Sequence, residues 1–470
     1  MSYAANELRD MARYIFDAAV RAADPYLAVT AALSRNGEEL TLSRPGMVDI
    51  SFSLSEFERI VIVGAGKAAA PMARAVEDTL GDRISEGLIC VKYGHTEPLC
   101  RTRVYEAGHP IPDQNGVAAA KHILELVGSL TAQDLLISLI SGGGSALMPA
   151  PVEGVTLAEL GEVTNLLLSS GAAIPEINSV RKHLSKISGG KLAVKAFPAV
   201  VISLILSDVI GDHLDVIASG PFMPDVTTFQ DAYQVLDKYG LVERMPPSVR
   251  DYLMQGSAGK VPETPKLGHR AFGRIYNQIV AGNLASLLAA RHAAADLGLS
   301  VLILSSLIEG EARATANILA AMAKEVLKSE NPVPPPVCLI MGGETTVTLK
   351  GTGLGGRCQE FALAAALALA EDKFPGQIVM LAGGTDGTDG PTDAAGAIVD
   401  HLTVKAARVM GLVPQDYLER NDSYHFFERT GELLKTGPTK TNVMDIYLAL
   451  IAAPDYDEAI GRGLSASGEI

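Results

Sequence analysis

Short apolar runs alternate with helix-like stretches between residue 59 and about residue 220, and this alternation constrains the fold more than any other feature of the sequence. The apolar runs, each typical of a buried strand, lie at residues 60–63, 87–91, 135–140 and 200–206. Strands that alternate with helices usually form a parallel sheet covered on both faces. This part of the chain therefore predicts an α/β fold with a doubly wound, Rossmann-like, mainly parallel sheet.

A second α/β series follows, as expected for a chain whose 470 residues exceed what one core usually supports. Its predicted strands lie at residues 275–281, 301–304, 337–341 and 377–381, and its predicted helices at 284–297, 311–327 and 359–370. Four prolines and three glycines between residues 245 and 268 indicate a linker. We therefore predict an N-terminal domain over 1–245, a hinge over 246–268 and a C-terminal domain over 269–470, with the active site in the cleft between the domains.

Composition narrows the functional classes. A formal net charge of −15 argues against nucleic acid and anionic membranes as partners. The four cysteines form no metal-type spacing and no disulfide framework, so we expect a reducing compartment. Charged residues break up the first thirty positions, and no apolar run reaches the ~18 residues of a membrane span. The sequence predicts a soluble, cytoplasmic protein.

The first predicted strand ends in Gly64-Ala65-Gly66-Lys67, which has the GxGxxA form of a dinucleotide-binding turn. The next strand ends at Lys92 without the acidic residue that would bind a ribose, which argues against NAD as a ligand. NADP stays an alternative, because Lys92 could face its phosphate. Lys67 opens a helix, where the helix dipole disfavours a lysine used only as a cap. We predict that Lys67 faces an anionic ligand; the alternative is a solvated surface lysine.

Ser141-Gly142-Gly143-Gly144-Ser145 directly follows the third predicted strand. Three successive glycines allow consecutive N–H groups to form an anion-binding nest, and the two hydroxyls add donors. We predict phosphate or carboxylate binding here, with a plain flexible loop as the alternative. A serine hydrolase is less favoured because the last glycine of a nucleophile elbow is missing.

Charged side chains follow in two groups. Arg181 and Lys182 belong to a basic stretch that suits an anionic substrate, although a solvated helix face would show the same pattern. Asp208 and Asp212 follow the strand at 200–206 and could bind a metal, orient a hydroxyl or cap a helix.

Gly355-Gly356-Arg357-Cys358 ends a glycine-rich loop that nearly matches a Walker A motif. The match fails because a cysteine cannot replace the hydroxyl that binds Mg²⁺, so the chain is not a P-loop NTPase. Arg357 opens a helix after this loop. Its planar guanidinium is suited to a bidentate grip on a phosphoryl group or a carboxylate.

Asp386, Asp389 and Asp393 lie in a glycine-rich tract that follows the strand at 377–381. Open α/β sheets bind ligands at the carboxyl ends of their strands, and carboxylates beside free backbone suit Mg²⁺. An Asp/Gly turn cluster without chemistry is the alternative. We predict Asp386 and Asp389 on the metal–phosphate side.

Together and in this order, the loops resemble the glycerate 2-kinase family whose C-terminal domain is of the MOFRL type. The resemblance runs from about residue 59 to residue 452, over the motifs named above and four more: Gly108-His109-Pro110, Ile217-Ala218-Ser219-Gly220-Pro221, Gly342-Gly343-Glu344-Thr345 and Thr436-Gly437-Pro438-Thr439. It implies phosphorylation of D-glycerate on its 2-hydroxyl, with ATP as donor and a divalent metal such as Mg²⁺.

The resemblance also implies roles for individual residues. Lys67 and Arg357 match the basic pair proposed as catalytic in the family, and we expect them to converge from facing domains. We add Asp208 as the group that orients the hydroxyl or binds metal. The remaining candidates are Arg181, Ser141 and Lys182 for substrate; Gly64, Gly66, Gly142, Gly143, Gly144, Ser145, Gly355 and Gly356 for ATP phosphates; and Asp386, Asp389 and Asp212 for metal.

The sequence departs from the family pattern at Cys358, where asparagine is usual, and at His213, Phe222 and Lys440.

Some relatives carry the name hydroxypyruvate reductase, so NAD(P)H-dependent reduction of hydroxypyruvate is the competing hypothesis. A sugar-acid binding protein without turnover is a third class. The expected partners are glycerate and ATP, and a homo-oligomer remains open.

Overall fold

The computed structural model describes residues 3–370 and 376–453 and contains two compact units. Residues 25–280 form one, here called the Rossmann-like unit; residues up to 24 and from 281 onward form the other, here called the mixed-sheet unit. This division differs from the predicted boundaries, because helix α1 (Ala5–Ala22) buries Leu8, Ile15 and Phe16 in the core of the mixed-sheet unit.

The Rossmann-like unit is built on a six-stranded sheet in the order β6-β5-β4-β7-β8-β9. Its strands are β4 (Arg59–Ala65), β5 (Ile84–Lys92), β6 (Thr102–Ala107), β7 (Asp134–Ile140), β8 (Val200–Leu206) and β9 (Ile275–Ala281). The five from β6 to β8 run parallel, as predicted. The chain runs outward from β4 to β6 and then returns to β7 beside β4, so the strand order reverses between β4 and β7, the position where such sheets bind ligands.

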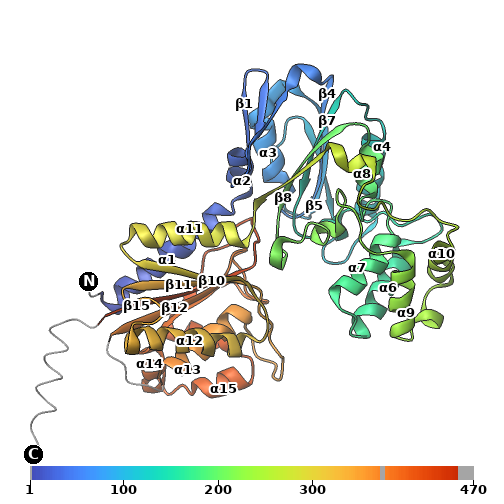
Figure 1. The fold of residues 1–470 in the computed structure, drawn as a ribbon. Helices are drawn as coiled ribbons and strands as arrows, with labels where there is room; N and C mark the ends of the chain where they lie inside the picture. Colours follow the sequence, from blue (N-terminus) through green and yellow to red (C-terminus); the bar gives the residue numbers. More distant parts are fainter. Residues whose placement is uncertain (1–2, 371–375, 454–470) are drawn as a thin grey trace, which may run out of the picture. The chain divides into compact units, whose positions relative to one another are not determined.

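Helices cover both faces of this sheet. Helices α4 (Gln114–Gly128) and α8 (Lys191–Ala196) pack on one face, and α3 (Ala69–Leu80) packs on the other, as Figure 1 shows. The short α5 (Gly144–Leu147) follows β7, and α2 (Pro25–Ala32) leads into a three-stranded antiparallel sheet, β1 (Leu33–Asn36), β2 (Glu39–Leu42) and β3 (Ile50–Ser53).

Four further helices form a small bundle with its own apolar core. They are α6 (Leu157–Ser169), α7 (Ile174–His183), α9 (Phe229–Lys238) and α10 (Pro247–Ser257), grouped beside the sheet of their unit in Figure 1. The predicted linker at 246–268 is therefore wrong over α10, which buries Val249 and Leu253. Its two prolines stand at the helix start, where a missing N–H is tolerated. The strand at 275–281 was also expected in the second domain, but β9 belongs to this sheet.

The mixed-sheet unit has the strand order β10-β11-β15-β12-β13-β14. Its strands are β10 (Ser300–Ile308), β11 (Val337–Gly343), β12 (Gln377–Gly384), β13 (Gly396–Asp400), β14 (Leu433–Leu434) and β15 (Asp445–Ala452). Only β10 and β11 run parallel; β15 lies antiparallel between β11 and β12. This strand is buried along its whole length and was not among those predicted.

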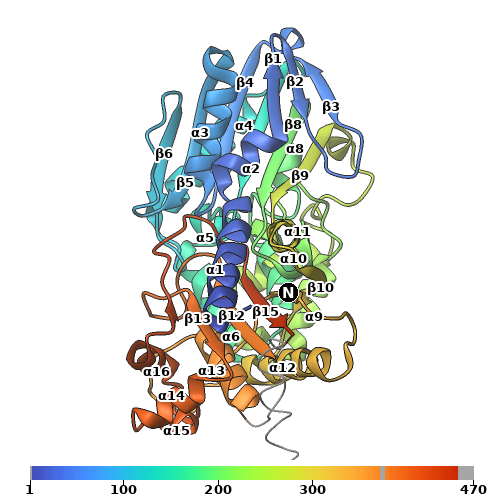
Figure 2. The same ribbon diagram turned by 90° about the vertical axis from the view of Figure 1, so that its left-hand side faces the viewer.

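Two helical layers enclose the mixed sheet, as Figures 1 and 2 show. On one face α1 and α11 (Asn283–Asp296) pack together, and on the other lie α12 (Ala312–Ser329) and α13 (Arg357–Ala370). Three short helices, α14 (Thr403–Val409), α15 (Pro414–Glu419) and α16 (Ser423–Thr430), extend the second layer. Within the described part of the chain, no helix is both long and apolar enough to cross a membrane.

Candidate functional site

The predicted glycine turns of the Rossmann-like unit meet at the carboxyl ends of β4 and β7. The backbone N–H of Lys67 donates to the carbonyl of Gly142 (3.0 Å), and the N–H of Ala68 donates to the buried Ser141 Oγ (3.0 Å). Gly64 and Gly66 lie on the same side of this junction, against Leu139 and Ser141. The two loops therefore form one structure, and Ser141 ties them together rather than presenting a free hydroxyl to substrate.

The triple-glycine loop is closely surrounded by polar side chains. The Asp208 carboxylate lies against Gly142, where a side chain would overlap it. Gly143 has φ +84° and lies against the imidazole of His109; a Cβ there would come within 2.7 Å of Cδ2. Burial, together with the charge of Lys67, lowers the pKa of His109 to about 4, so a neutral imidazole faces the loop near pH 7. His109 was only part of a matched motif in the sequence; its contact with Gly143 was not predicted.

Two of the predicted cations in this unit, Lys67 and Arg181, have no side-chain partner among the described residues. Within residues 3–370 and 376–453, neither the Lys67 ammonium nor the Arg181 guanidinium forms an ion pair or side-chain hydrogen bond. Both side chains are half-buried, and desolvation lowers the pKa of Arg181. A partly buried charge without a counter-ion is unfavourable, so both positions favour an anionic ligand.

Lys182 does not share this arrangement. Its side chain is buried, and its Nζ pairs with Asp215 (3.2 Å) and Asp225 (3.5 Å). These ion pairs account for Lys182 without a substrate, so it is no longer a substrate-binding candidate. The basic stretch of the sequence thus separates into one paired and one unpaired cation.

The loop after β8 contains several backbone positions in the left-handed region. Asp212, Ala218 and Ser219 have φ values of 55°, 48° and 59°. Such conformations in residues other than glycine cost free energy and cluster at functional sites. The segment η4 (Ile217–Ser219) contacts α7, and Ser219 Oγ lies 2.8 Å from Ser145 Oγ, so this loop links the triple-glycine turn to the helix of Arg181. Asp212 Oδ1 is buried with no hydrogen-bond partner in the described structure.

In the mixed-sheet unit, Arg357 is held by two carboxylates. Its Nε and Nη2 donate to Asp445 Oδ2 (2.6 Å) and Oδ1 (3.0 Å), and its Nη1 lies 2.7 Å from Glu344 Oε1. Burial alone would lower the pKa of Arg357, but the charge of Asp445 outweighs it and raises that pKa. The guanidinium therefore stays charged at any working pH. Asp445 was not predicted, although an acidic residue that opens a long apolar run was a usable signal.

Asp389 caps the helix of Arg357. Its two oxygens accept the backbone N–H groups of Cys358 (3.1 Å) and Gln359 (2.8 Å), so both are used by the first turn of α13. Capping thus accounts for Asp389 without a metal, and its predicted role as a metal ligand stays a prediction. The Asp386 carboxylate, by contrast, accepts one hydrogen bond from the described residues, donated by the N–H of Thr388 (3.0 Å). The Cys358 side chain is buried, and its thiol interacts with the Asp445 carboxylate that holds Arg357, so the change from the family's usual asparagine lies beside this ion pair.

A cavity of about 380 Å³ adjoins this arginine. Its walls include the predicted Gly355 and Gly356, and also Thr345, Arg357 and Asp389. The glycine-rich loop and the start of α13 thus border a space large enough for part of a phosphorylated ligand. Among the described residues, no group of three or more His, Cys, Asp or Glu side chains is arranged to hold a metal ion.

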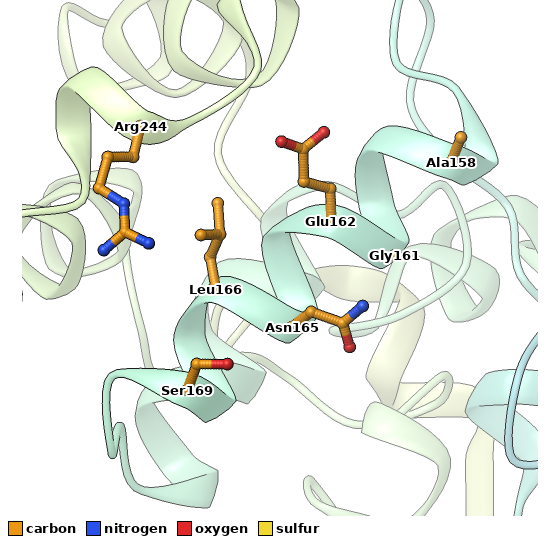
Figure 3. Close-up of a pocket in the computed structure, with 7 residues that line it drawn as sticks. All are labelled: Ala158, Gly161, Glu162, Asn165, Leu166, Ser169 and Arg244. Atoms are coloured by element: carbon orange, nitrogen blue, oxygen red, sulfur yellow. The ribbon is translucent and has the colours of Figure 1, made fainter.

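Figure 3 shows the residues that line a different pocket, most of them on α6. The volume of this pocket is about 460 Å³. Its lining includes Glu162 and Arg244, the latter from η5 (Val242–Arg244), and contains none of the predicted site residues. We assign it no role.

Comparison with known proteins places these features in context. Residues 11–254 match the family model "Domain of unknown function (DUF4147)", and residues 337–445 match the MOFRL family. A D-glycerate 2-kinase of Thermotoga maritima is 46% identical over 84% of this chain and 91% of its own. A glycerate 2-kinase of Pyrococcus horikoshii is 41% identical over 96% of this chain and 98% of its own.

The solved structure of a glycerate kinase from Thermotoga maritima superposes with a TM-score of 0.84 at 40% identity, covering 95% of this chain and 100% of that chain. A protein of Agrobacterium vitis, 43% identical over 94% of both chains, bears the name hydroxypyruvate reductase, which is presented there as provisional.

Proposed function

We propose, from the premise that the chain belongs to the glycerate kinase family with DUF4147 and MOFRL domains, that it phosphorylates D-glycerate on the 2-hydroxyl with ATP as the donor. One observation carries the proposal most directly. Although the protein has a net charge of −15, the Lys67 and Arg181 side chains are half-buried with no partner among the described residues. Both belong to the unit whose glycine nest lies where the strand order of the sheet reverses. Such a site suits a small anionic substrate.

In the reaction, the 2-hydroxyl oxygen attacks the γ-phosphorus, the bond to the β–γ bridging oxygen breaks, and ADP leaves. We assign Lys67 and the amides of Gly142, Gly143 and Gly144 to the phosphates and Arg181 to the glycerate carboxylate. Arg357 neutralises charge that develops on the transferred group. Asp208 accepts or orients the proton of the 2-hydroxyl.

Mg²⁺ would shield the charge of the ATP phosphates. Because Mg²⁺ usually takes one or two protein carboxylates and fills its other positions with water and phosphate oxygens, few ligands are needed. Asp212, with its buried oxygen that lacks a partner in the described structure, and Asp386, with one oxygen in a hydrogen bond, fit this requirement. Asp389 is less suited, because backbone amides already occupy one acceptor position on each of its oxygens.

An enolase-coupled assay tests the proposal. Enolase consumes 2-phosphoglycerate but not the 3-isomer, so we expect signal from D-glycerate and Mg-ATP without added phosphoglycerate mutase. A signal that requires the mutase would place the phosphate on the 3-hydroxyl. Oxidation of NAD(P)H with hydroxypyruvate, without phosphorylation of glycerate, would replace the kinase with the reductase; β5 ends at Lys92 without the acidic residue that a ribose would need. Binding of glycerate without turnover would leave only a binding protein.

A further inference from the structure

A chain of buried hydroxyl groups stands behind the Arg357–Asp445 pair. Asp445 opens β15, and Tyr447, two residues further, lies on the same face of the strand. The Tyr447 hydroxyl lies 3.0 Å from Asp445 Oδ2, and Thr345 Oγ1 lies 3.0 Å from the Tyr447 oxygen. Since a carboxylate can only accept, Tyr447 donates to Asp445 and Thr345 must then donate to Tyr447. The hydrogen bonds therefore run in one direction, toward the arginine.

The network is buried except at the Arg357 side chain. Asp445, Tyr447 and Thr345 are each at most 1% exposed, whereas the Arg357 side chain is 33% exposed and borders the 380 Å³ cavity. The Tyr447 ring stacks on Phe361, one helical turn beyond Arg357 on α13, with ring centroids 4.4 Å apart. Strand β15 and helix α13 are thus joined both by the ion pair and by the stacked rings.

We propose that Tyr447 and Thr345 act as positioning residues for phosphoryl transfer, by fixing the Asp445 carboxylate and through it the orientation of the Arg357 guanidinium. The proposal rests on the function proposed for Arg357. The terminal torsion of an aspartate is soft, so a carboxylate held only by the arginine could rotate together with it. The Tyr447 hydroxyl provides a third fixed contact. An arginine held in this way stabilises the transition state without reorganising during the reaction.

The simpler reading is that the network only anchors α13 to the sheet. Stability alone cannot separate the two readings, because removing a buried hydrogen bond destabilises the protein in either case. They differ in their coupling to Arg357. A positioning residue loses its effect on the rate when the arginine no longer makes its bidentate contact, whereas a purely structural residue does not.

The test is a double-mutant cycle between Tyr447→Phe and Arg357→Lys, with kcat and KM measured for glycerate and ATP. Phenylalanine keeps the stacked ring, and lysine keeps the charge but not the bidentate geometry. We expect Tyr447→Phe to lower kcat about tenfold with KM nearly unchanged, and to change kcat less than about twofold in the Arg357→Lys background. Thr345→Val should produce a smaller loss of the same kind.

Tyr417→Phe is the matched control, because it removes another buried hydroxyl of the same unit, one that accepts from Arg429 (2.9 Å) on α16. It should lower stability without lowering kcat. Equal losses from Tyr447→Phe in both backgrounds, or no loss of kcat in either, would overturn the proposal. Near-normal turnover by Arg357→Lys and Arg357→Ala would instead remove Arg357 from the reaction, which is a failure of the proposed function.

Discussion

At the scale of single residues, Asp389 shows how one carboxylate can serve different purposes. The sequence predicted a metal ligand, and the structure shows a cap on α13. Residue type and spacing cannot separate these roles, since a cation and a helix N-terminus both attract an anionic oxygen. The ligand-facing roles of Lys67, Arg181 and Arg357 stay predictions. Among the described residues the first two have no side-chain partner, whereas Arg357 is held by Asp445 and Glu344.

Asp389 also predicts a pH dependence of stability. Burial raises its pKa to about 7 in the folded protein, while backbone N–H groups oppose that shift, and its usual value is near 3.8. A group whose pKa is raised in the folded state stabilises the protein fully at a pH below its pKa in the unfolded state. This stabilisation is lost as the pH rises through its pKa in the folded state. The free energy of unfolding of the native protein, relative to Asp389→Asn, should therefore fall between about pH 4 and about pH 7 and then level off.

Urea unfolding of both proteins across this range measures the difference. Asp393→Asn is the control, because Lys435 and Tyr424 lower the pKa of this exposed carboxylate. Its contribution is lost only as the pH falls through that lowered pKa, so the Asp393 difference should stay flat from about pH 5 to about pH 8. A rise of the Asp389 difference with pH would contradict the assignment.

At the scale of elements, the end of α7 depends on a lysine from the next helix. Lys191 Nζ donates to the carbonyls of Lys182 (3.0 Å), His183 (3.3 Å) and Ser185 (2.6 Å). It thereby satisfies carbonyls that the helix leaves free and places a cation at the negative end of the helix dipole. Arg181 lies in this last turn, so its position depends on the same contacts.

Lys191→Met should therefore loosen the last turn of α7 and weaken binding through Arg181. We expect the KM for glycerate to rise by about three- to tenfold, with a smaller change in kcat, because the loss falls mainly on ground-state binding. Lys195→Met, an exposed position on the same helix, should leave both constants near their native values. Steady-state kinetics of the two variants provide the comparison. Equal changes in KM and kcat for both variants would show that Lys191 does not act on Arg181 through α7.

The sequence predicted most elements whose signal is local. Buried strands of the Rossmann-like unit stood out as apolar runs before glycine turns, and α3, α11, α12 and α13 followed helical patterns. The error at α10 arose because two prolines were interpreted as a linker when they begin a helix. The missed β15 has a clear apolar run, but its central place in the sheet depends on pairing with distant strands, which local pattern does not encode.

At the scale of the whole molecule, Lys67 and Arg357 belong to different units and are assigned to one chemical step. Replacing either with alanine should lower kcat/KM by about 10² to 10⁴, while circular dichroism shows a preserved fold. Residues that act as a unit are strongly non-additive, so the double variant should lose no more than about tenfold beyond the worse single variant. A double loss equal to the product of the single losses would mean that the two cations contribute independently.

The packing of α1 on the far end of the chain has a consequence for synthesis on the ribosome. The helix emerges early, but its buried face fits a core completed only by strands from residue 300 onward, and the central strand β15 is made last among the described strands. The Rossmann-like unit can fold in the meantime, because all of its strands are translated first. A nascent chain cut short before residue 445 would thus carry one finished unit and one open sheet with unpaired edges, a natural substrate for chaperones and proteases.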